Sequence, residues 1–346
     1  MATKDVYEEL ADMLVTAPTG GPGMKTPELM EILRLTYTPR EARVAVQVGF
    51  EGAKLDEISE KTGIEKGKLK RILDTMAEKC TMWIDPGKED PTYRAGGIAG
   101  CGISETLWGG IRFPFSVQLG KLWNKYKYTW AKEGIAQTGP VFPIWPGSAT
   151  LPDDALPSEN IAEHLKRCDY WAVSTCPCKL WHWLDEPGHH CTHMLETCFV
   201  LNDLGRFCVE HNMARELTCD EAIELLRKTN EDGLVHMGAP TAVLCNCDND
   251  CCSVILSHLL YGRNSLRRSD FVPEIDEETC NACKICAERC PMGAIEVDGF
   301  AAIDRNLCIG CGVCISGCPP KAMRLMRRPE AERLGPMIPL APVGEE

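Results

Sequence analysis

Eight cysteines near the C-terminus are spaced as two copies of one metal-binding motif. The first copy reads C-x2-C-x2-C-x3-C before Pro291, and the second repeats that spacing 28 residues later, before Pro319. Three close thiolates and a fourth before proline are typical of paired [4Fe-4S] clusters. Four-thiolate zinc sites, the alternative, use C-x2-C pairs separated by longer loops. The two copies are Cys280, Cys283, Cys286 and Cys290, and Cys308, Cys311, Cys314 and Cys318.

The motif is that of bacterial-type ferredoxins and predicts crossed ligation, because the cysteine before proline binds the other cluster. The repeat extends beyond the cysteines, since Ile275-Asp276 before the first copy matches Ile303-Asp304 before the second. The expected ligand sets are Cys280, Cys283, Cys286 and Cys318 for the first cluster, and Cys308, Cys311, Cys314 and Cys290 for the second.

A second group of eight cysteines lies in the middle of the chain. Thiolates at this density suit iron–sulfur clusters or zinc. Two C-x-C pairs each follow a predicted strand, which would bring both pairs to one end of a small sheet. Eight thiolates suffice for two further [4Fe-4S] clusters, or for one cluster and one zinc ion, and free buried cysteines are the alternative. The eight are Cys176, Cys178, Cys191, Cys198, Cys245, Cys247, Cys251 and Cys252.

Nearby histidines and the remaining cysteines have alternative interpretations. His189, His190 and His193 surround Cys191 and are either ligands or parts of a solvated loop. We interpret His182 and His236 as structural. The five remaining cysteines are interpreted as buried apolar residues or free thiols; they are Cys80, Cys101, Cys168, Cys208 and Cys219.

Composition limits the class of protein. The chain has 346 residues, of which 21 are cysteine, and a net charge of −13. Its first 20 residues contain four acidic side chains and no long apolar run, so we expect a protein of the reducing cytoplasm without a transmembrane segment. The acidic balance argues against nucleic acid and anionic lipid, and favours docking to basic patches on protein partners.

We predict an α+β fold that combines a winged helix, a mixed α/β cysteine-rich middle module and a ferredoxin-like 2[4Fe-4S] domain. Pro, Gly and acidic stretches suggest the boundaries between six segments. These are an N-terminal helical segment (1–37), the winged helix (38–95), an aromatic, Pro/Gly-rich connecting region (96–160), the middle module (161–269), the ferredoxin domain (270–328) and a Pro-rich tail (329–346).

Residues 38–95 follow the pattern of a winged helix. Apolar periodicity predicts helices over 40–50, 55–62 and 66–79, and a wing hairpin pairs 81–84 with 92–94. Residues 40–79 carry nine basic and eight acidic side chains, a balance that favours protein docking over DNA binding. A basic strip facing solvent or a partner is expected at Lys66, Lys68, Lys70 and Arg71.

Further elements are predicted between residues 114 and 261. Helices are expected over 114–132, 161–166, 194–211, 219–228 and 253–261, and strands over 170–174 and 242–244. The aromatic residues of the first of these helices should serve packing rather than bind a cofactor; they are Trp123, Tyr126, Tyr128 and Trp130.

From about residue 38 to 325 the chain resembles a group of 4Fe-4S dicluster-domain proteins of anaerobic bacteria and archaea. The resemblance rests on the stretch Thr38–Val46, on the C-x-C pair Cys176/Cys178, on Leu195–Cys198, on Gly233–His236, and on the stretch Cys245–Cys252. Members of the group often carry more cysteines in the last stretch, where this chain has Asp248 and Asp250. The resemblance implies cluster binding in the middle module, with Cys245, Cys247, Cys251 and Cys252 as the surviving set.

The expected function is electron transfer: a soluble iron–sulfur protein or subunit that passes low-potential electrons to or from a partner oxidoreductase in anaerobic metabolism, within a multisubunit complex or a homo-oligomer. No nucleotide-binding motif is present, so a pyridine-nucleotide dehydrogenase or an ATPase is not indicated. Two alternatives stay open: an enzyme whose middle module holds a cluster with an open iron site, and a winged-helix redox-sensing transcription regulator.

Overall fold

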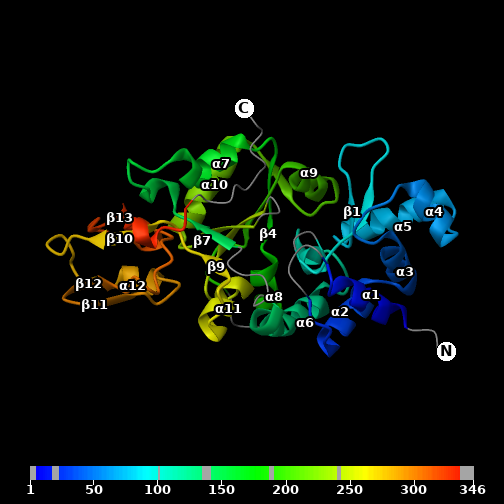
Figure 1. Ribbon diagram of the computed structural model, residues 1–346, viewed down its shortest axis with the longest axis horizontal. Coiled ribbons are helices and arrows are strands. Elements are labelled where there is room, and N and C mark those ends of the chain that lie inside the picture. Colours follow the sequence, from blue (N-terminus) through cyan, green and yellow to red (C-terminus); the bar gives the residue numbers. More distant parts are fainter. Residues whose placement is uncertain are drawn as a thin grey trace. The chain divides into compact units, whose positions relative to one another are not determined.

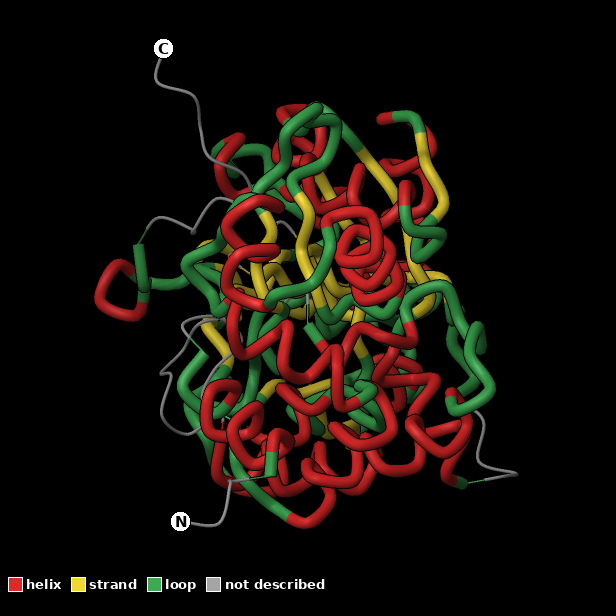
Figure 2. Tube along the Cα trace, turned by 90° about the vertical axis from the view of Figure 1, so that its right-hand side faces the viewer, coloured by secondary structure: helices red, strands yellow, loops and turns green. Residues whose placement is uncertain are grey.

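The structure is a computed structural model that describes residues 5–17, 23–99, 102–134, 142–186, 191–239 and 243–335. Helices and strands are mixed along the chain (Figures 1 and 2). The predicted middle module contributes residues to both of two compact units. The first unit is Met1–Thr138, Ser174–Cys191 and Asp203–Glu216, and the second is Gly139–Val173, Thr192–Asn202 and Leu217–Glu346. Within the described ranges, no helix combines the length and apolar character that crossing a bilayer requires.

The first unit begins with five helices, four of which have a side-chain cap at their N-terminus. The side chain of Thr26 caps α2, and Thr38 and Glu41 form a reciprocal capping box at α3. Pro27 and Pro39 follow these caps at the first helical position, where proline is favoured. The helices are α1 (Val6–Leu14), α2 (Pro27–Thr36), α3 (Pro39–Val48), α4 (Leu55–Thr62) and α5 (Lys66–Glu78).

A short hairpin follows α5, in which β1 (Met82–Ile84) pairs antiparallel with β2 (Tyr93–Ala95). The three helices and the hairpin expected between residues 38 and 95 are therefore present in the expected order. Their assignment as a winged helix stays a prediction.

A buried ion pair joins two helices of this part of the chain. Lys79 Nζ lies 2.7 Å from Glu41 Oε2 and donates to the carbonyl oxygen of Thr36, also at 2.7 Å. Both charged side chains are less than 10% exposed. Burial lowers the pKa of Lys79, and the Glu41 carboxylate opposes that shift.

The rest of the first unit packs around α6 (Ser116–Thr129), which continues into a π-helical turn (Trp130–Gly134). Trp123 of α6 stacks on Trp181 of α8 (Pro177–Asp185) with ring centroids 5.2 Å apart. Trp123 and Tyr126 are buried, as expected for side chains that serve packing. A 3-10 turn (Ile103–Leu107) precedes α6, and α9 (Asn202–Glu210) completes the helices of this part.

A seven-stranded mixed sheet supplies the framework of the second unit. Five of its strands belong to that unit: β5, β8, β7, β3 and β9. The strand order is β6-β4-β5-β8-β7-β3-β9. The neighbours β5–β8, β8–β7 and β7–β3 are antiparallel, and β3–β9 is parallel. The strands are β3 (Phe142–Trp145), β4 (Trp171–Thr175), β5 (Glu196–Leu201), β6 (Arg215–Leu217), β7 (Val235–Ala239), β8 (Val243–Cys247) and β9 (Leu266–Arg267).

Helices cover this sheet and bury its apolar side chains. Ile161 and Leu165 of α7 and Leu226 of α10 share a core with Phe199 of β5 and Leu244 of β8. The helices are α7 (Ile161–Arg167), α10 (Cys219–Glu231) and α11 (Ser253–Tyr261), with short 3-10 turns at Ser148–Thr150 and Pro157–Glu159.

Two sequence-based element predictions need correction. The helix predicted over 194–211 is wrong, because Glu196–Leu201 forms β5 and only Asn202–Glu210 is helical. The run from Thr197 to Leu201 is buried at every position, and such a run does not distinguish a buried strand from a helix. The strand predicted over 242–244 is too short: Ala242 lies outside the described residues, and β8 continues to Cys247, so Cys245 and Cys247 lie within a strand.

The C-terminal part of the second unit is a pair of β-α-β repeats. The first repeat contains β10 (Phe271–Ile275), α12 (Ile285–Arg289) and β11 (Ile295–Asp298). The second contains β12 (Phe300–Ile303), α13 (Val313–Ser316) and β13 (Met323–Arg327), followed by a 3-10 turn at Glu330–Glu332. β10 pairs antiparallel with β13, and β11 with β12, so each sheet takes one strand from each repeat.

The buried ion pair generates a test of stability. We expect Lys79→Met to destabilise the chain by about 3–5 kcal/mol, because Glu41 keeps its charge in a buried position without its partner. The double change Lys79→Met with Glu41→Leu should cost much less, since no buried charge remains. Anaerobic urea unfolding followed by circular dichroism measures both.

The matched control is Lys70→Met, which breaks the exposed pair with Asp74 and should change stability by less than about 1 kcal/mol. The expectation would be contradicted if the double variant lost as much stability as Lys79→Met and Glu41→Leu lose separately, added together.

Candidate iron-sulfur centres

The two cysteine loops of the C-terminal repeats share one backbone arrangement. Cys280 donates its amide to the carbonyl oxygen of Asp276 at 3.0 Å, and Cys308 donates to Asp304 at the same distance. The loops are also tied crosswise: Asp276 donates to Ala322 and Asp304 donates to Ala294, both at 2.8 Å. Each of these bonds has its counterpart 28 residues away, so the repeat noticed in the sequence is a structural pseudo-symmetry.

The loops differ in how closely the rest of the unit packs against them. Ala282 and Lys284 adopt left-handed backbone conformations, with φ of 54° and 64°, and lie in the exposed first loop. The equivalent positions of the second loop are Gly310 and Gly312, with φ of 71° and 76°. A Cβ on Gly310 would lie 2.2 Å from Ser269 Oγ. The conformation favours glycine in both loops, and close packing requires it in the second.

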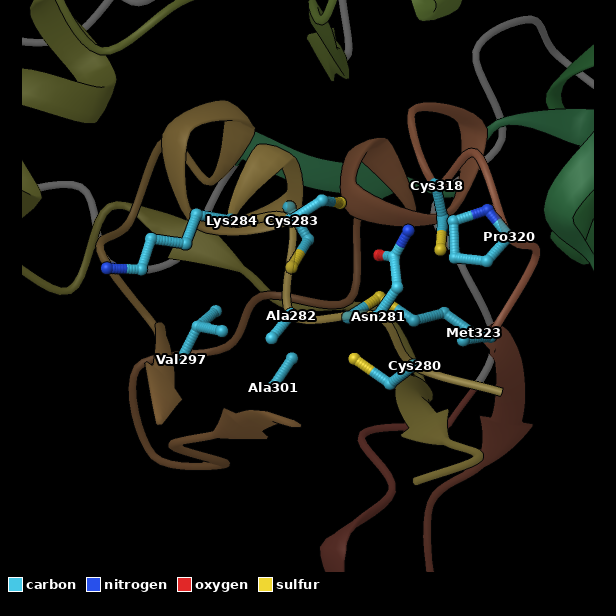
Figure 3. Close-up of a pocket in the computed structure, with 12 residues that line it drawn as sticks. Cys280, Asn281, Ala282, Cys283, Lys284, Val297, Ala301, Cys318, Pro320 and Met323 are labelled. Atoms are coloured by element: carbon cyan, nitrogen blue, oxygen red, sulfur yellow. The ribbon is translucent and has the colours of Figure 1, made fainter. Parts of the chain in front are cut away.

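The first cysteine set lines a single pocket. Figure 3 shows the sulfur atoms of Cys280, Cys283 and Cys318 directed toward the same space, although Cys318 comes from the other repeat. Cys286 also lines this pocket and is buried, whereas Cys283 is exposed. Lys284 is the one charged side chain among the described residues that line it, and it points away from the sulfur atoms (Figure 3). Three thiols of the first loop and Cys318 of the other repeat thus line one pocket, and their joint binding of one cluster stays a prediction.

The second cysteine set is more deeply placed. Burial raises the pKa of the Cys311 thiol to about 12, and neighbouring Cys308 and Cys290 contribute to the shift. Burial also raises the pKa of Cys314 well above its ordinary value, with Cys311, Cys308 and Cys290 as its principal thiol neighbours. Cys290 of the first repeat is therefore close to the three cysteines of the second.

The residues of both sets fit a thiolate-bound cluster. Each set offers four sulfur atoms, three from one loop and one from the opposite repeat, and four thiolates are what a [4Fe-4S] cluster needs. Raised thiol pKa values mean that the buried sulfurs are poorly solvated as anions, a cost that a bound cationic metal removes.

A third group of four thiols lies on the large sheet. β5 and β8 are antiparallel, and Phe199 pairs with Leu244. Extending this register by one residue places Cys198 of β5 opposite Cys245 of β8. Cys247 lies two residues further along β8 and therefore on the same face. Cys252 is the N-terminal cap of α11. Hydrogen bonds from Cys198 and Cys247 lower the pKa of Cys245, and bonds with Cys245 and Cys252 raise that of Cys247.

A polar network on the opposite face fixes this part of the sheet. Asn246 Oδ1 accepts from His236 Nδ1 at 2.6 Å and from Thr229 Oγ1 at 3.1 Å, and its amide nitrogen donates to the carbonyl oxygen of Thr197 at 2.8 Å. Burial lowers the pKa of His236 to about 4, so the ring is neutral at pH 7. The sequence indicated only that His236 is structural; Asn246 had no signal beyond its place between two cysteines.

The remaining middle-module cysteines are distributed over both units. Cys176 is the N-terminal cap of α8 and Cys178 lies in its first turn, and both belong to the first unit with Cys191. Cys251 belongs to the second unit and is buried. Asp248 Oδ1 accepts the amides of Asp250 and Cys251 at 2.9 and 2.8 Å, so this aspartate shapes the turn.

The other candidate residues are placed as follows. His193 Nδ1 lies 3.3 Å from the carboxylate of Asp232, whereas His189 and His190 fall outside the described residues. His182 is buried in the first unit. Of the five cysteines interpreted as non-ligands, Cys80, Cys168 and Cys208 are buried, Cys219 is partly exposed, and Cys101 is not among the described residues.

Comparison with known proteins identifies one part of the chain. Residues 279–323 match the sequence profile of the 4Fe-4S dicluster domain. No curated protein matches the chain. The matched region contains the C-terminal cysteine sets, and such a domain implies [4Fe-4S] clusters and, in general terms, iron–sulfur electron transfer. The chain therefore carries a C-terminal 4Fe-4S dicluster domain within a larger mixed α/β structure.

Proposed function

We propose that this chain is an electron-transfer protein or subunit that carries low-potential electrons between partner proteins in anaerobic metabolism. The observation that carries the proposal is the convergence of Cys280, Cys283, Cys286 and Cys318, drawn from two repeats, on one pocket at the surface of the dicluster domain. When bound, each cluster accepts and releases one electron. The protein supplies the thiolate ligands, the spacing between the clusters and the docking surface.

The two cysteine sets have different roles in this proposal. Cys280, Cys283, Cys286 and Cys318 hold the exposed cluster, where Cys283 provides the edge nearest to a partner. Cys308, Cys311, Cys314 and Cys290 hold the enclosed cluster, whose loop packs against residues 147–150 and Ser269. Electrons would enter or leave through the exposed set, because a partner can approach it closely.

A third metal centre belongs to the same proposal. Cys198, Cys245, Cys247 and Cys252 form a hydrogen-bonded group of four thiols, a donor set that suits a [4Fe-4S] cluster or zinc. We favour the cluster, since it would extend the electron path of the dicluster domain. The thiols of Cys176, Cys178, Cys191 and Cys251 remain sequence-based candidates for further ligation.

Crossed ligation predicts an unusual effect of one substitution. We expect Cys318→Ser to alter the cluster held by Cys280, Cys283 and Cys286, and to leave the cluster of its own sequence neighbours intact. Cys290→Ser should have the reciprocal effect. Electron paramagnetic resonance (EPR) of the reduced proteins, purified without oxygen, distinguishes the two signals.

Cys219→Ser is the matched control, because this partly exposed cysteine belongs to neither set. If Cys318→Ser and Cys290→Ser altered the same signal, the crossed assignment would be wrong.

The third centre predicts the metal content. The native chain should contain about 12 iron and 12 acid-labile sulfide, at about four of each per cluster. Cys245→Ser should lower the iron content by about four without removing the dicluster signals. Plasma emission spectroscopy of anaerobically purified protein measures iron and zinc together.

Eight iron and no zinc would refute a metal-bearing middle module. Eight iron with one zinc would identify the third centre as a zinc site.

The proposed partner surface is a basic groove between α3 and α5. Arg40, Arg43, Lys68 and Arg71 line this open groove, and none of them has an ion-pair partner within the described part of the chain. Glu41, the acidic residue of the groove, is buried and bound to Lys79. Four unpaired cations on a chain of net charge −13 suit an acidic protein surface, whether of a redox partner or of a second copy.

This groove refines the basic strip expected from the sequence. Lys66 and Lys70 form ion pairs with Asp56 and Asp74, at 2.7 and 2.9 Å, whereas Lys68 and Arg71 face the groove. The four residues of the strip are therefore not equivalent, and only two are free to bind a partner.

Charge reversal tests the groove. We expect Arg43→Glu with Arg71→Glu to weaken association at least about tenfold, because complementary charges across a rim become repulsive. Lys66→Glu with Lys70→Glu changes the net charge equally and should have a smaller effect. Association is measured by sedimentation velocity of the chain alone and with the protein that co-purifies with it without oxygen.

Salt-sensitive, sequence-selective binding to duplex DNA from upstream of its own coding sequence, at about 150 mM salt, would instead support the transcription-regulator alternative. Equal effects of both charge-reversed pairs would exclude the groove as the docking site.

A further inference from the structure

A buried arginine lies against the second cysteine set. Arg328, which directly follows β13, has no exposed surface. Its Nη2 donates to the carbonyl oxygen of Cys308 at 2.8 Å, and its Nε donates to that of Ser269 at 3.3 Å. The guanidinium therefore contacts a ligand of the second set.

One acidic and one basic side chain of the described residues lie near Arg328. Glu332 Oε2 is 3.6 Å from Arg328 Nη1, and the Glu332 side chain is 38% exposed. Arg268 is a second cation close enough to affect the pKa of Arg328. Since exposed charges are screened by water, Glu332 offsets the buried guanidinium only in part.

Among the described residues, no fully buried cation takes the equivalent place beside the first cysteine set. The position 28 residues before Arg328 is Phe300, a partly exposed aromatic residue of β12. Lys284, the charged residue of the first pocket, is exposed and directed away from the sulfur atoms (Figure 3). The pseudo-symmetry of the repeats is thus broken at position 328, where the second repeat carries a buried positive charge.

Two opposing effects act on the second cluster. The potential of an iron–sulfur cluster depends on its net charge, on hydrogen bonds to its sulfur ligands and on its exposure to solvent. Reduction adds negative charge, which burial disfavours and a nearby cation stabilises. A buried charge is screened less than an exposed one. Arg328 should therefore affect the potential of the second cluster more than Glu332 or Arg268 does.

We propose that Arg328 raises the reduction potential of the second cluster, so that this enclosed cluster accepts electrons from the exposed first one. In that step one electron leaves the first cluster, which is oxidised, and enters the second, which is reduced; no bond is made or broken. The electron comes from a reduced protein partner. Arg328 acts here as a positioning and charge-setting residue, and the inference rests on the ligand sets proposed above.

The test compares four variants of the full chain by EPR-monitored redox titration. Arg328→Gln should lower the ratio of reduced to oxidised second cluster at a fixed potential about tenfold, equivalent to about 59 mV for one electron. Arg328→Lys should largely restore the ratio, because it keeps the charge. Glu332→Gln should raise it, because it removes the counter-charge. Arg324→Gln is the control, since that arginine is 74% exposed and binds Glu274.

The signals are assigned to the two clusters with Cys290→Ser and Cys318→Ser. An unchanged potential in both Arg328→Gln and Glu332→Gln, or an equal shift of the first cluster, would overturn the proposal. If Arg328→Gln fails to assemble, as iron content and circular dichroism would reveal, Glu332→Gln decides: a raised potential supports the proposal and an unchanged one refutes it. If the proposed cysteine sets do not bind clusters, the unaltered protein will instead lack the expected iron.

Discussion

The two repeats of the dicluster domain depend on each other. One pocket is lined by three cysteines of the first loop and by Cys318 of the second repeat, and the proposed crossed ligation extends this exchange to Cys290. The two sheets are built the same way, because β10 pairs with β13 and β11 with β12 across the repeats. Folding of either repeat therefore requires the other, and metal binding would add its free energy to the assembled pair alone.

The two cysteine loops are chemically similar but have different surroundings. The backbone of the loops is conserved between the repeats, including the left-handed positions 282, 284, 310 and 312. Alanine and lysine are tolerated at these conformations in the first loop, which faces solvent. Glycine is needed in the second, where Ser269 and Thr150 leave no room for a side chain. One loop is thereby available to a partner, and the other is enclosed and open to tuning by neighbouring charges.

The sequence predicted most accurately what is encoded within a few residues. Apolar periodicity predicted helices over 40–50, 55–62 and 66–79, and α3, α4 and α5 begin and end within two residues of these bounds. It failed over residues 194–211, because Thr197–Leu201 is buried on both faces of a central strand and its apolar run has no distinguishing period. The sequence indicated Lys68 and Arg71 of the groove but not Arg40 or Arg43, which come from another helix. Arg328 carried no local signal, because its importance comes from segments distant in the sequence.

The group of four thiols on the large sheet shows how a register can determine a site. Cys198, Cys245 and Cys247 share a face only while β5 and β8 keep their observed pairing. A slip of one residue would move both β8 cysteines to the other face and bring Asn246 toward Cys198. Asn246 opposes such a slip, because its bonds to His236, Thr229 and Thr197 tie β8 to three other elements at once. The polar network on one face of the sheet thus holds in place the thiols on the other face.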